Sequence, residues 1–255
     1  MTLPQDIIDW IKDYSEKNNN LKLVVGVSGG VDSALVSTLC AMTGIDTHVV
    51  SMPIHQKENQ LSLAKQHIEW LKSKFQNVYT HEHDLTESFE HYKNTMMVYD
   101  DSLGWANTRS RFRMITLYLI ANYCKGIVVG TGNKVEDFGV GFFTKYGDGG
   151  VDISPIADLT KTEVRNMAKK VGVIDGIIQA KPTDGLWDDG RTDEDQIGAT
   201  YKELEWAMQQ KDLNKKLIDF KGREKEVFQI LKKFNKQNLH KMNPIPIYKV
   251  PEILK

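Results

Sequence analysis

The chain has 255 residues, and its 33 Lys and Arg residues nearly balance its 34 Asp and Glu residues, so its formal net charge is −1. A dedicated nucleic-acid-binding protein needs an excess of positive charge to contact phosphates, and this balance argues against that class. With 26% charged and 40% hydrophobic residues, the composition is typical of a soluble globular protein and excludes a disordered or fibrous chain.

Short apolar runs alternate with longer segments of helical period, which predicts βαβ units around a mostly parallel sheet. The predicted strands cover residues 21–27, 47–54, 77–85 and 126–132. The predicted helices cover residues 34–42, 58–75, 106–124, 160–171, 192–209 and 224–234. No repeat, low-complexity tract or Pro/Gly-rich linker divides the chain. We therefore predict an α/β fold of the Rossmann-like, doubly wound type, as a single domain over residues 1–255.

The helix predicted at residues 106–124 carries apolar side chains three and four positions apart. A helix that covers one face of a sheet presents such a stripe to the core. The series that we expect to pack on the sheet is Ile115, Tyr118, Leu119 and Asn122, with Ile120 and Tyr123 beside it.

The strongest chemical signal is the segment GVSGGVDS, residues 26–33, which directly follows a predicted strand and precedes a helix. A glycine turn at a helix N-terminus gathers backbone N–H groups, which hold phosphate without much positive charge. The GK[ST] ending of the Walker pattern is absent. The residues predicted to bind the phosphates of ATP are Gly26, Val27, Ser28, Gly29, Gly30, Val31, Asp32 and Ser33. The alternative is a plain sharp turn, with Asp32 as an acid that the helix dipole favours.

At these residues the sequence resembles the ATP pyrophosphatase group, in which an SGGxDS loop holds the pyrophosphate of ATP while an acid is adenylated. Further segments look like ammonia-dependent NAD synthetase, in the same order and with similar spacing along nearly the whole chain. These segments are NTRSRFRM (107–114), GTGNKVEDFGVGFFTKYGDGGVDISPI (130–156), LTKTEV (159–164) and KPTDGLW (181–187). The resemblance implies a ligase that uses ATP, Mg²⁺ and ammonia to amidate deamido-NAD through an adenylated carboxylate. The products are NAD, AMP and pyrophosphate, in the last step of NAD biosynthesis.

The resemblance also implies roles for individual residues. Asp32 and Glu136 are similar to the family's magnesium ligands, one after each of two predicted strands. Thr131, Lys161 and Thr183 are similar to ATP contacts, and Lys161, a point charge against phosphate, is also a catalytic candidate. Outside this context, Glu136 would be a solvated acid in the first turn of a helix and Lys161 an exposed helix lysine.

For deamido-NAD, the matching positions are Arg111, Lys145, Asp152, His240 and Lys241. A dinucleotide carries a pyrophosphate and two riboses, so basic donors and a hydroxyl-accepting carboxylate suit it. Asp148, in the GDGG segment, resembles an acid that takes a proton from ammonium, and it is the second catalytic candidate. The plain alternatives are a solvated basic helix face around Arg111, a frayed basic tail, and a turn aspartate at position 148.

The segment KPTDGLWDDGRTDED, residues 181–195, is a predicted long loop rich in Asp, Gly and Thr. Long loops in compact domains are usually functional or mobile. We expect a hydrated lid that becomes ordered over bound ATP, with Thr192 capping the helix that follows. A dense metal site formed by its acids is the alternative.

Other functions fit parts of the pattern less well. A tRNA thiolase would share the glycine loop, but it needs catalytic or cluster cysteines, and Cys40 and Cys124 lie on apolar helical faces. A glutamine-using synthetase needs an additional amidotransferase domain, for which 255 residues leave no room. A regulatory module that holds ATP without turnover does not account for two separated acids at positions 32 and 136. The basic excess of residues 211–241 fits solvated helices better than an RNA-facing patch.

The cysteines and the N-terminal segment favour the cytoplasm. The two cysteines form no CxxC pair, and residues 1–17 mix acids with apolar residues, unlike a secretory signal. No segment approaches the roughly 20 apolar residues that span a bilayer. We therefore expect a cytoplasmic protein without membrane or nucleic-acid partners. The resemblance implies a homodimer whose deamido-NAD site lies across two subunits.

Overall fold

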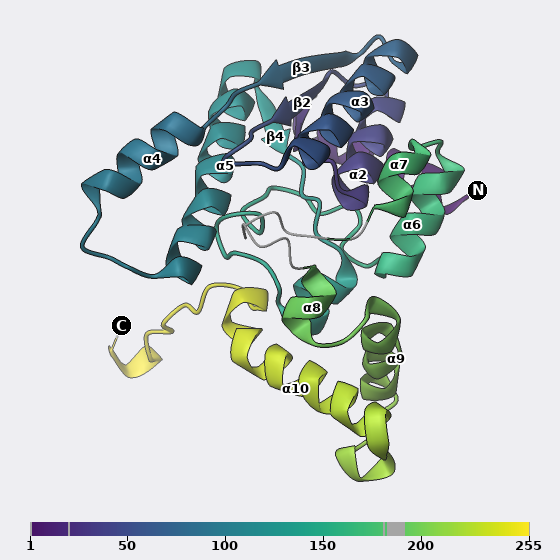
Figure 1. Cartoon of the computed structure of the whole chain (residues 1–255), viewed down its shortest axis with the longest axis vertical. Helices are drawn as coiled ribbons and strands as arrows, with labels where there is room; N and C mark the ends of the chain where they lie inside the picture. The colour runs from purple at the N-terminus through teal and green to yellow at the C-terminus, as the bar shows by residue number, and fades with distance from the viewer. Residues whose placement is uncertain (1, 20, 181, 183–191, 255) are drawn as a thin grey trace.

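The computed structural model of the chain describes residues 2–19, 21–180, 182 and 192–254. A four-stranded parallel sheet forms its centre, in the order β3-β2-β1-β4 (Figure 1). The strands are β1 (Lys22–Gly26), β2 (Thr47–Ser51), β3 (Val78–Glu82) and β4 (Gly126–Val128). A parallel bridge between Val129 and Ile153 extends the sheet beyond β4. The predicted α/β class with a parallel sheet is confirmed, although the strands are shorter than the predicted runs.

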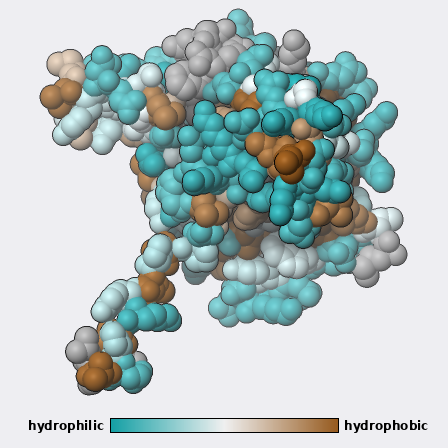
Figure 2. All heavy atoms as spheres, turned by 90° about the horizontal axis from the view of Figure 1, so that it is seen from below, coloured by the Kyte–Doolittle hydropathy of each residue, from teal (hydrophilic) through white to brown (hydrophobic). Residues whose placement is uncertain are grey.

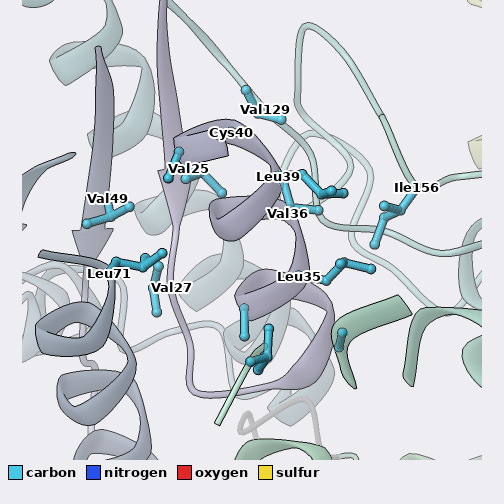
Figure 3. Packing of buried hydrophobic residues seen from close by; sticks show 14 of the residues in the cluster. Val25, Val27, Leu35, Val36, Leu39, Cys40, Val49, Leu71, Val129 and Ile156 are labelled. Atoms are coloured by element: carbon cyan, nitrogen blue, oxygen red, sulfur yellow. The ribbon is translucent and has the colours of Figure 1, made fainter. Parts of the chain in front are cut away.

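Helices cover both faces of the sheet. Neighbouring residues in a strand point to opposite faces, so Val25 packs on one side of β1 and Val24 on the other. The first face is covered by α1 (Leu3–Lys17), α2 (Val31–Met42), α3 (Glu58–Lys74), α6 (Lys161–Lys170) and α7 (Asp175–Gln179). Figure 3 shows Leu39 and its neighbours on α2 near the strand valines. The second face is covered by α5 (Ser102–Cys124), which contributes Ile120 and Ala121.

A separate packing region lies beside the sheet and is built by the C-terminal helices (Figure 1). It consists of α8 (Asp193–Ile197), α9 (Tyr201–Asp212), α10 (Gly222–Met242) and the π-helix η1 (Val135–Val140). Its core includes Leu204, Phe228 and Leu231. Because η1 follows closely after β4, this region is joined to the carboxyl edge of the sheet. The short helices η2 (Leu217–Asp219) and η3 (Glu252–Leu254) complete the C-terminal part.

The predicted packing face of α5 is right for Ile120 and Tyr118 and wrong for three other residues. Ile115 and Leu119 are 55% and 71% exposed, and Tyr123 is 87% exposed. The helix buries Ile120 and Ala121 against the sheet, and Tyr118 packs there in part. The reason is that α5 has apolar residues around much of its circumference, so periodicity alone does not select the side that meets the core.

The predicted helix at residues 192–209 is two helices. It is interrupted at Gly198, which takes a left-handed conformation with φ of 83° and ends α8. Thr200 then caps α9 by accepting a hydrogen bond from the amide of Glu203. A further helix, α4 (Thr86–Thr95), was not predicted, and α10 is longer than the predicted range 224–234 at both ends.

Thr192 caps α8, as predicted, by accepting a hydrogen bond from the amide of Asp195. Most of the proposed lid, including Thr183, lies outside the described residues. Within the described part of the chain, no helix is long and apolar enough to cross a membrane.

Candidate active site

The glycine loop joins β1 to α2 and has a tightly defined shape. Gly29 has φ of +87°, and a side chain there would place its Cβ 2.6 Å from the carbonyl oxygen of Gln60. The hydroxyls of Ser28 and Ser33 lie 3.2 Å apart, and the Ser33 hydroxyl accepts from the amide of Ser28 at the same distance. Only glycine fits at position 29, for conformational and steric reasons together. The loop therefore brings backbone amides and two hydroxyls to the N-terminus of α2.

Three charged side chains meet beside this loop. The ammonium Nζ of Lys161 lies 2.6 Å from Oδ2 of Asp32 and 2.9 Å from Oε1 of Glu136. The Lys161 side chain is 4% exposed, whereas the two carboxylates keep 16% and 18%. Asp32 comes from the first turn of α2, Glu136 from η1 and Lys161 from the first turn of α6. The structure thus brings the predicted metal ligands and the predicted catalytic lysine into direct contact.

The charges of this group depend on one another. Burial alone would lower the pKa of Lys161, but Asp32 and Glu136 raise it well above its usual value, so the ammonium stays charged. Burial acts to raise the pKa of Glu136, yet Lys161 and a hydrogen bond from Tyr201 lower it overall. Burial raises the pKa of Asp32 despite Lys161, because one ammonium does not neutralise two carboxylates.

Two side chains that sequence reasoning missed hold the carboxylates. Asn133 is fully buried, and its Nδ2 donates to Oδ1 of Asp32 at 3.0 Å. Its Oδ1 accepts from the amide of Glu136 at 3.1 Å. The hydroxyl of Tyr201, at the start of α9, donates to Oε1 of Glu136 at 2.5 Å. Burial, with Glu136 and Asp193 nearby, raises the pKa of Tyr201, which remains a protonated donor.

Asp148 is exposed but firmly held. Its Oδ1 accepts from the hydroxyl of Ser110 at 2.7 Å and from the amide of Thr144 at 2.9 Å. The amide of Asp148 donates back to the Ser110 hydroxyl at 2.8 Å. Ser110 lies on α5, so this aspartate is fixed between the helix and the glycine-rich segment. The hydrogen bonds from Ser110 and Thr144 both go to the same carboxylate oxygen.

Four of the five predicted deamido-NAD residues form one connected group. Nη2 of Arg111 donates to the carbonyl of Lys145 at 3.3 Å, and Nζ of Lys145 donates to the carbonyl of His240 at 2.9 Å. Nζ of Lys241 donates to the carbonyl of Phe143 at 2.7 Å. Burial lowers the pKa of Lys241, although the charge of Asp148 acts in the opposite direction. The C-terminal basic pair is therefore not a frayed tail, because it ends α10 against residues 143–145.

The fifth residue, Asp152, is held elsewhere. Its Oδ1 accepts from the hydroxyl of Tyr118 at 3.0 Å, and its Oδ2 accepts from the amide of Val128 at 2.7 Å. These bonds attach Asp152 to α5 and to the end of β4. Thr131 follows β4 and is half-buried close in sequence to Asn133.

Asp137 adds a second acid beside the metal candidates. Its Oδ2 lies so close to Gly132 that a Cβ there would sit 2.1 Å from it. Burial, followed by the charges of Glu136, Asp148 and Asp32, raises the pKa of Asp137 to about 8. Sequence reasoning did not single out Asp137, although it lies next to Glu136 in the segment that carries the resemblance.

The site provides a hard-oxygen donor set for a divalent cation. The carboxylates of Asp32 and Glu136 come from two different elements and both contact the ammonium group of Lys161. Within the described residues, no group of three or more His, Cys, Asp or Glu side chains is arranged to hold a metal. Two carboxylates fit a cation such as Mg²⁺, which usually takes its other ligands from water and substrate phosphates.

A glycine-rich loop before a helix at the carboxyl edge of a parallel sheet, with buried carboxylates next to it, is typical of α/β nucleotide-binding proteins. More specifically, residues 3–245 match the family model described as NAD synthase, so the chain belongs to the NAD synthase family.

Relatives and solved structures agree with this assignment. An NH(3)-dependent NAD(+) synthetase of Finegoldia magna is 37% identical over 88% of this chain and 91% of its own length. A second, from Methanococcoides burtonii, is 40% identical over 80% of this chain and 76% of its own. The structure of NMN synthetase from Francisella tularensis superposes with a TM-score of 0.84 at 28% identity, covering 98% of this chain and 97% of that chain. An NH3-dependent NAD synthetase from Campylobacter jejuni shares the fold, with a TM-score of 0.78 and 97% coverage of both chains.

The raised pKa of Asp137 makes stability depend on pH. The carboxyl of Asp137 is protonated in the folded protein up to about pH 8, whereas its ordinary pKa, which applies to the unfolded chain, is 3.8. The contribution of Asp137 to the free energy of unfolding is therefore complete below about pH 4 and is lost as the pH rises through 8. Because the side chain is half-buried and partly screened, we expect a loss on the order of 3 kcal/mol over this range.

Asp137→Asn, which mimics the protonated group, should flatten this dependence in urea unfolding measured at several pH values. The comparison between wild type and variant isolates Asp137 from the other titrating groups. Parallel curves for the two proteins would contradict the assigned pKa.

Proposed function

We propose that this chain amidates deamido-NAD with ammonia at the expense of ATP, through an adenylated carboxylate, and releases NAD, AMP and pyrophosphate. Family membership bears out the ligase activity expected from the sequence, which forms a C–N bond in NAD biosynthesis. The single structural observation that supports the mechanism is the contact of Lys161 with Asp32 and Glu136 beside the glycine loop.

The chemistry explains why such a site is needed. A carboxylate is a poor electrophile, and its oxygen is a poor leaving group. Transfer of AMP to the substrate carboxylate corrects both faults, and ammonia then displaces AMP. The loop at Ser28–Ser33 would hold the departing pyrophosphate through its amides and hydroxyls. Lys161 would move its charge toward the phosphates, where it neutralises the negative charge that develops.

Asp32 and Glu136 would hold Mg²⁺ in this reaction. When bound, Mg²⁺ neutralises charge on phosphate oxygens and aligns them for in-line displacement. The fixed positions of the two carboxylates, held by Asn133 and Tyr201, support this assignment. Thr131 and Thr183 are the remaining proposed ATP contacts, and Thr183 lies outside the described residues.

The basic group around Lys145 would bind deamido-NAD. Arg111, Lys145, His240 and Lys241 come from three elements and converge next to Asp148. Basic donors suit the pyrophosphate of a dinucleotide. Asp152 has both oxygens engaged, but each carboxylate oxygen accepts more than one hydrogen bond, so a ribose hydroxyl remains a compatible partner.

Asp148 is the proposed acceptor of a proton from ammonium. The residue lies in an exposed turn, one carboxylate oxygen is fixed by Ser110 and Thr144, and burial of the carboxyl raises its pKa. A fixed, accessible carboxylate attracts the ammonium cation and takes its proton, which leaves neutral ammonia as the nucleophile.

We further propose that residues 1–255 work as one catalytic domain in the cytoplasm. The site takes Asp32 from the sheet region and Tyr201 from the C-terminal packing region, which supports a single functional unit. The free thiols of Cys40 and Cys124 are consistent with a reducing compartment.

The structural likeness to an NMN synthetase suggests a second candidate substrate, nicotinic acid mononucleotide. The shorter molecule would use the same ATP chemistry but would lack the adenosine half of the dinucleotide.

Purified protein with ATP, Mg²⁺ and ammonium should form AMP, pyrophosphate and the amide from deamido-NAD faster than from the mononucleotide. Asp32→Asn should reduce turnover by about a hundredfold, because it removes one of the two anionic oxygen donors. Asp13→Asn is the matched control, since Asp13 is an exposed carboxylate that pairs with Lys17 on α1. Chromatographic product analysis gives the rates, and circular dichroism checks the fold. Full activity of folded Asp32→Asn would exclude this residue from the mechanism, and faster amidation of the mononucleotide would reverse the substrate assignment.

A homodimer is also part of the proposal. Ile115, Leu119 and Tyr123 form an exposed apolar row along α5. Further exposed apolar residues lie at Met97 and Val98, before α5. The C-terminal segment projects from the body with hydrophobic side chains near its end (Figure 2). Exposed apolar surface of this extent is typical of a protein–protein interface.

Leu119→Glu should convert the dimer to a monomer, because it places a charge in the apolar row of α5. Sedimentation equilibrium measures the mass, for which one chain contributes 29.1 kDa. Ile218→Glu is the matched control, since Ile218 is 85% exposed on η2, outside the row. A monomeric wild type, or an unchanged dimer for Leu119→Glu, would contradict the assigned interface.

A further inference from the structure

Tyr201 contacts two of the three charged residues of the site. Its hydroxyl donates to Oε1 of Glu136 at 2.5 Å, and Nζ of Lys161 lies 4.9 Å from the centre of its ring. The residue is 2% exposed and begins α9, which Thr200 caps. A buried phenol needs a hydrogen-bond partner, and here that partner is a carboxylate of the site, which links the packing of Tyr201 to the position of Glu136.

Glu136 needs an external support. It lies in the first turn of η1, a π-helix, where the backbone departs from the regular α-helical pattern. Its carboxylate contacts Lys161, while Asn133 accepts from its backbone amide and also hydrogen-bonds to its carboxylate. Lys161 and Tyr201 donate to its carboxylate at 2.9 and 2.5 Å. Tyr201 is the uncharged donor of the two.

The hydroxyl of Tyr201 is itself oriented. It lies 3.2 Å from Oδ2 of Asp193, a residue that is 5% exposed at the start of α8. The amide of Tyr201 donates to Oε1 of Glu194 at 2.8 Å. The start of α9 is therefore tied to α8 on one side and to the Glu136 carboxylate on the other, so the position of the phenol is determined by the C-terminal packing region.

We propose that Tyr201 is a positioning residue that fixes the Glu136 carboxylate for a divalent cation and keeps Lys161 beside it. Hydrogen-bond partners of metal-binding carboxylates orient those groups and commonly change metal affinity by tenfold or more when they are removed. The inference rests on the proposed role of Glu136 as a metal ligand. The C-terminal helices then contribute to the metal site through a side chain that does not touch the metal.

Tyr201→Phe is the informative variant, because it removes the hydroxyl and keeps the buried ring and its contact with Lys161. Mn²⁺ is the probe, added with a nonhydrolysable α,β-methylene analogue of ATP at fixed concentration. The thermal unfolding midpoint, followed against Mn²⁺ concentration, gives the metal half-saturation without any turnover. The Mg²⁺ dependence of turnover is measured in parallel.

For Tyr201→Phe, we expect the half-saturating concentrations of Mn²⁺ and Mg²⁺ to rise about tenfold. Turnover at saturating Mg²⁺ should remain within about threefold of wild type, because the ligands themselves are intact. A purely structural role would lower the unfolding temperature without metal and leave both half-saturating concentrations unchanged, and that result would overturn the inference.

Two further variants make the outcome specific. Thr162→Val removes a different hydrogen bond to α9, from the Thr162 hydroxyl on α6 to Glu205 at 2.8 Å, without touching Glu136. It should leave metal half-saturation unchanged, and an equal shift in this variant would assign the effect to general loosening of the two helices.

Glu136→Gln tests the proposed role of Glu136 as a metal ligand. If Glu136→Gln binds Mn²⁺ as wild type does, the proposed metal ligand fails, whereas a shift in Glu136→Gln but not in Tyr201→Phe defeats only the inference about Tyr201.

Discussion

The shared contact of one ammonium group with two carboxylates constrains the whole site. Lys161 is nearly fully buried, and a buried charge is tolerated only where opposite charges and hydrogen bonds compensate for lost hydration. Its partners come from the turn after β1 and from η1, so α6, α2 and η1 must assemble together. Removal of either carboxylate would disturb the lysine as well as the proposed metal position. The same contact thus links the geometry of the fold to the chemistry of the site.

The parallel sheet explains why residues so far apart in the sequence meet. All four strands run in the same direction, so the segments that follow β1 and β4 emerge at one edge. Asp32 follows β1 and Asn133 follows β4, and these adjacent strands place the two side chains within a hydrogen bond of each other. The C-terminal region then packs on η1 and adds Tyr201 from the outer side.

Features that depend on local sequence pattern were predicted correctly, whereas features that depend on tertiary packing were not. Alternating strands and helices indicated the parallel sheet, and short motifs indicated Asp32, Glu136 and Lys161, which the fold brings into contact. Ile115, Leu119 and Tyr123 on α5 were predicted wrongly to pack on the sheet, because apolar residues on several sides of one helix do not reveal which side meets it. Tyr201 was missed because its partner Glu136 is 65 positions away in the sequence, and the residues around Tyr201 give no sign of this contact. Asn133 lay inside the segment that carried the resemblance, but an asparagine at a strand end is equally common in turns.

The local excess of acid raises the question of how such a site would hold the phosphates of ATP. Asp32, Glu136 and Asp137 lie together, and the raised pKa of Asp137 removes one of these charges near neutral pH. The glycine loop provides dipoles and hydroxyls with no net charge. Lys161 is already committed to two carboxylates, so a triphosphate entering next to them needs additional positive charge. A divalent cation held by Asp32 and Glu136 would supply that charge, and Lys161 would then be available to the phosphates. The proposed dependence on Mg²⁺ thus follows from the charge balance of the site as well as from its oxygen ligands.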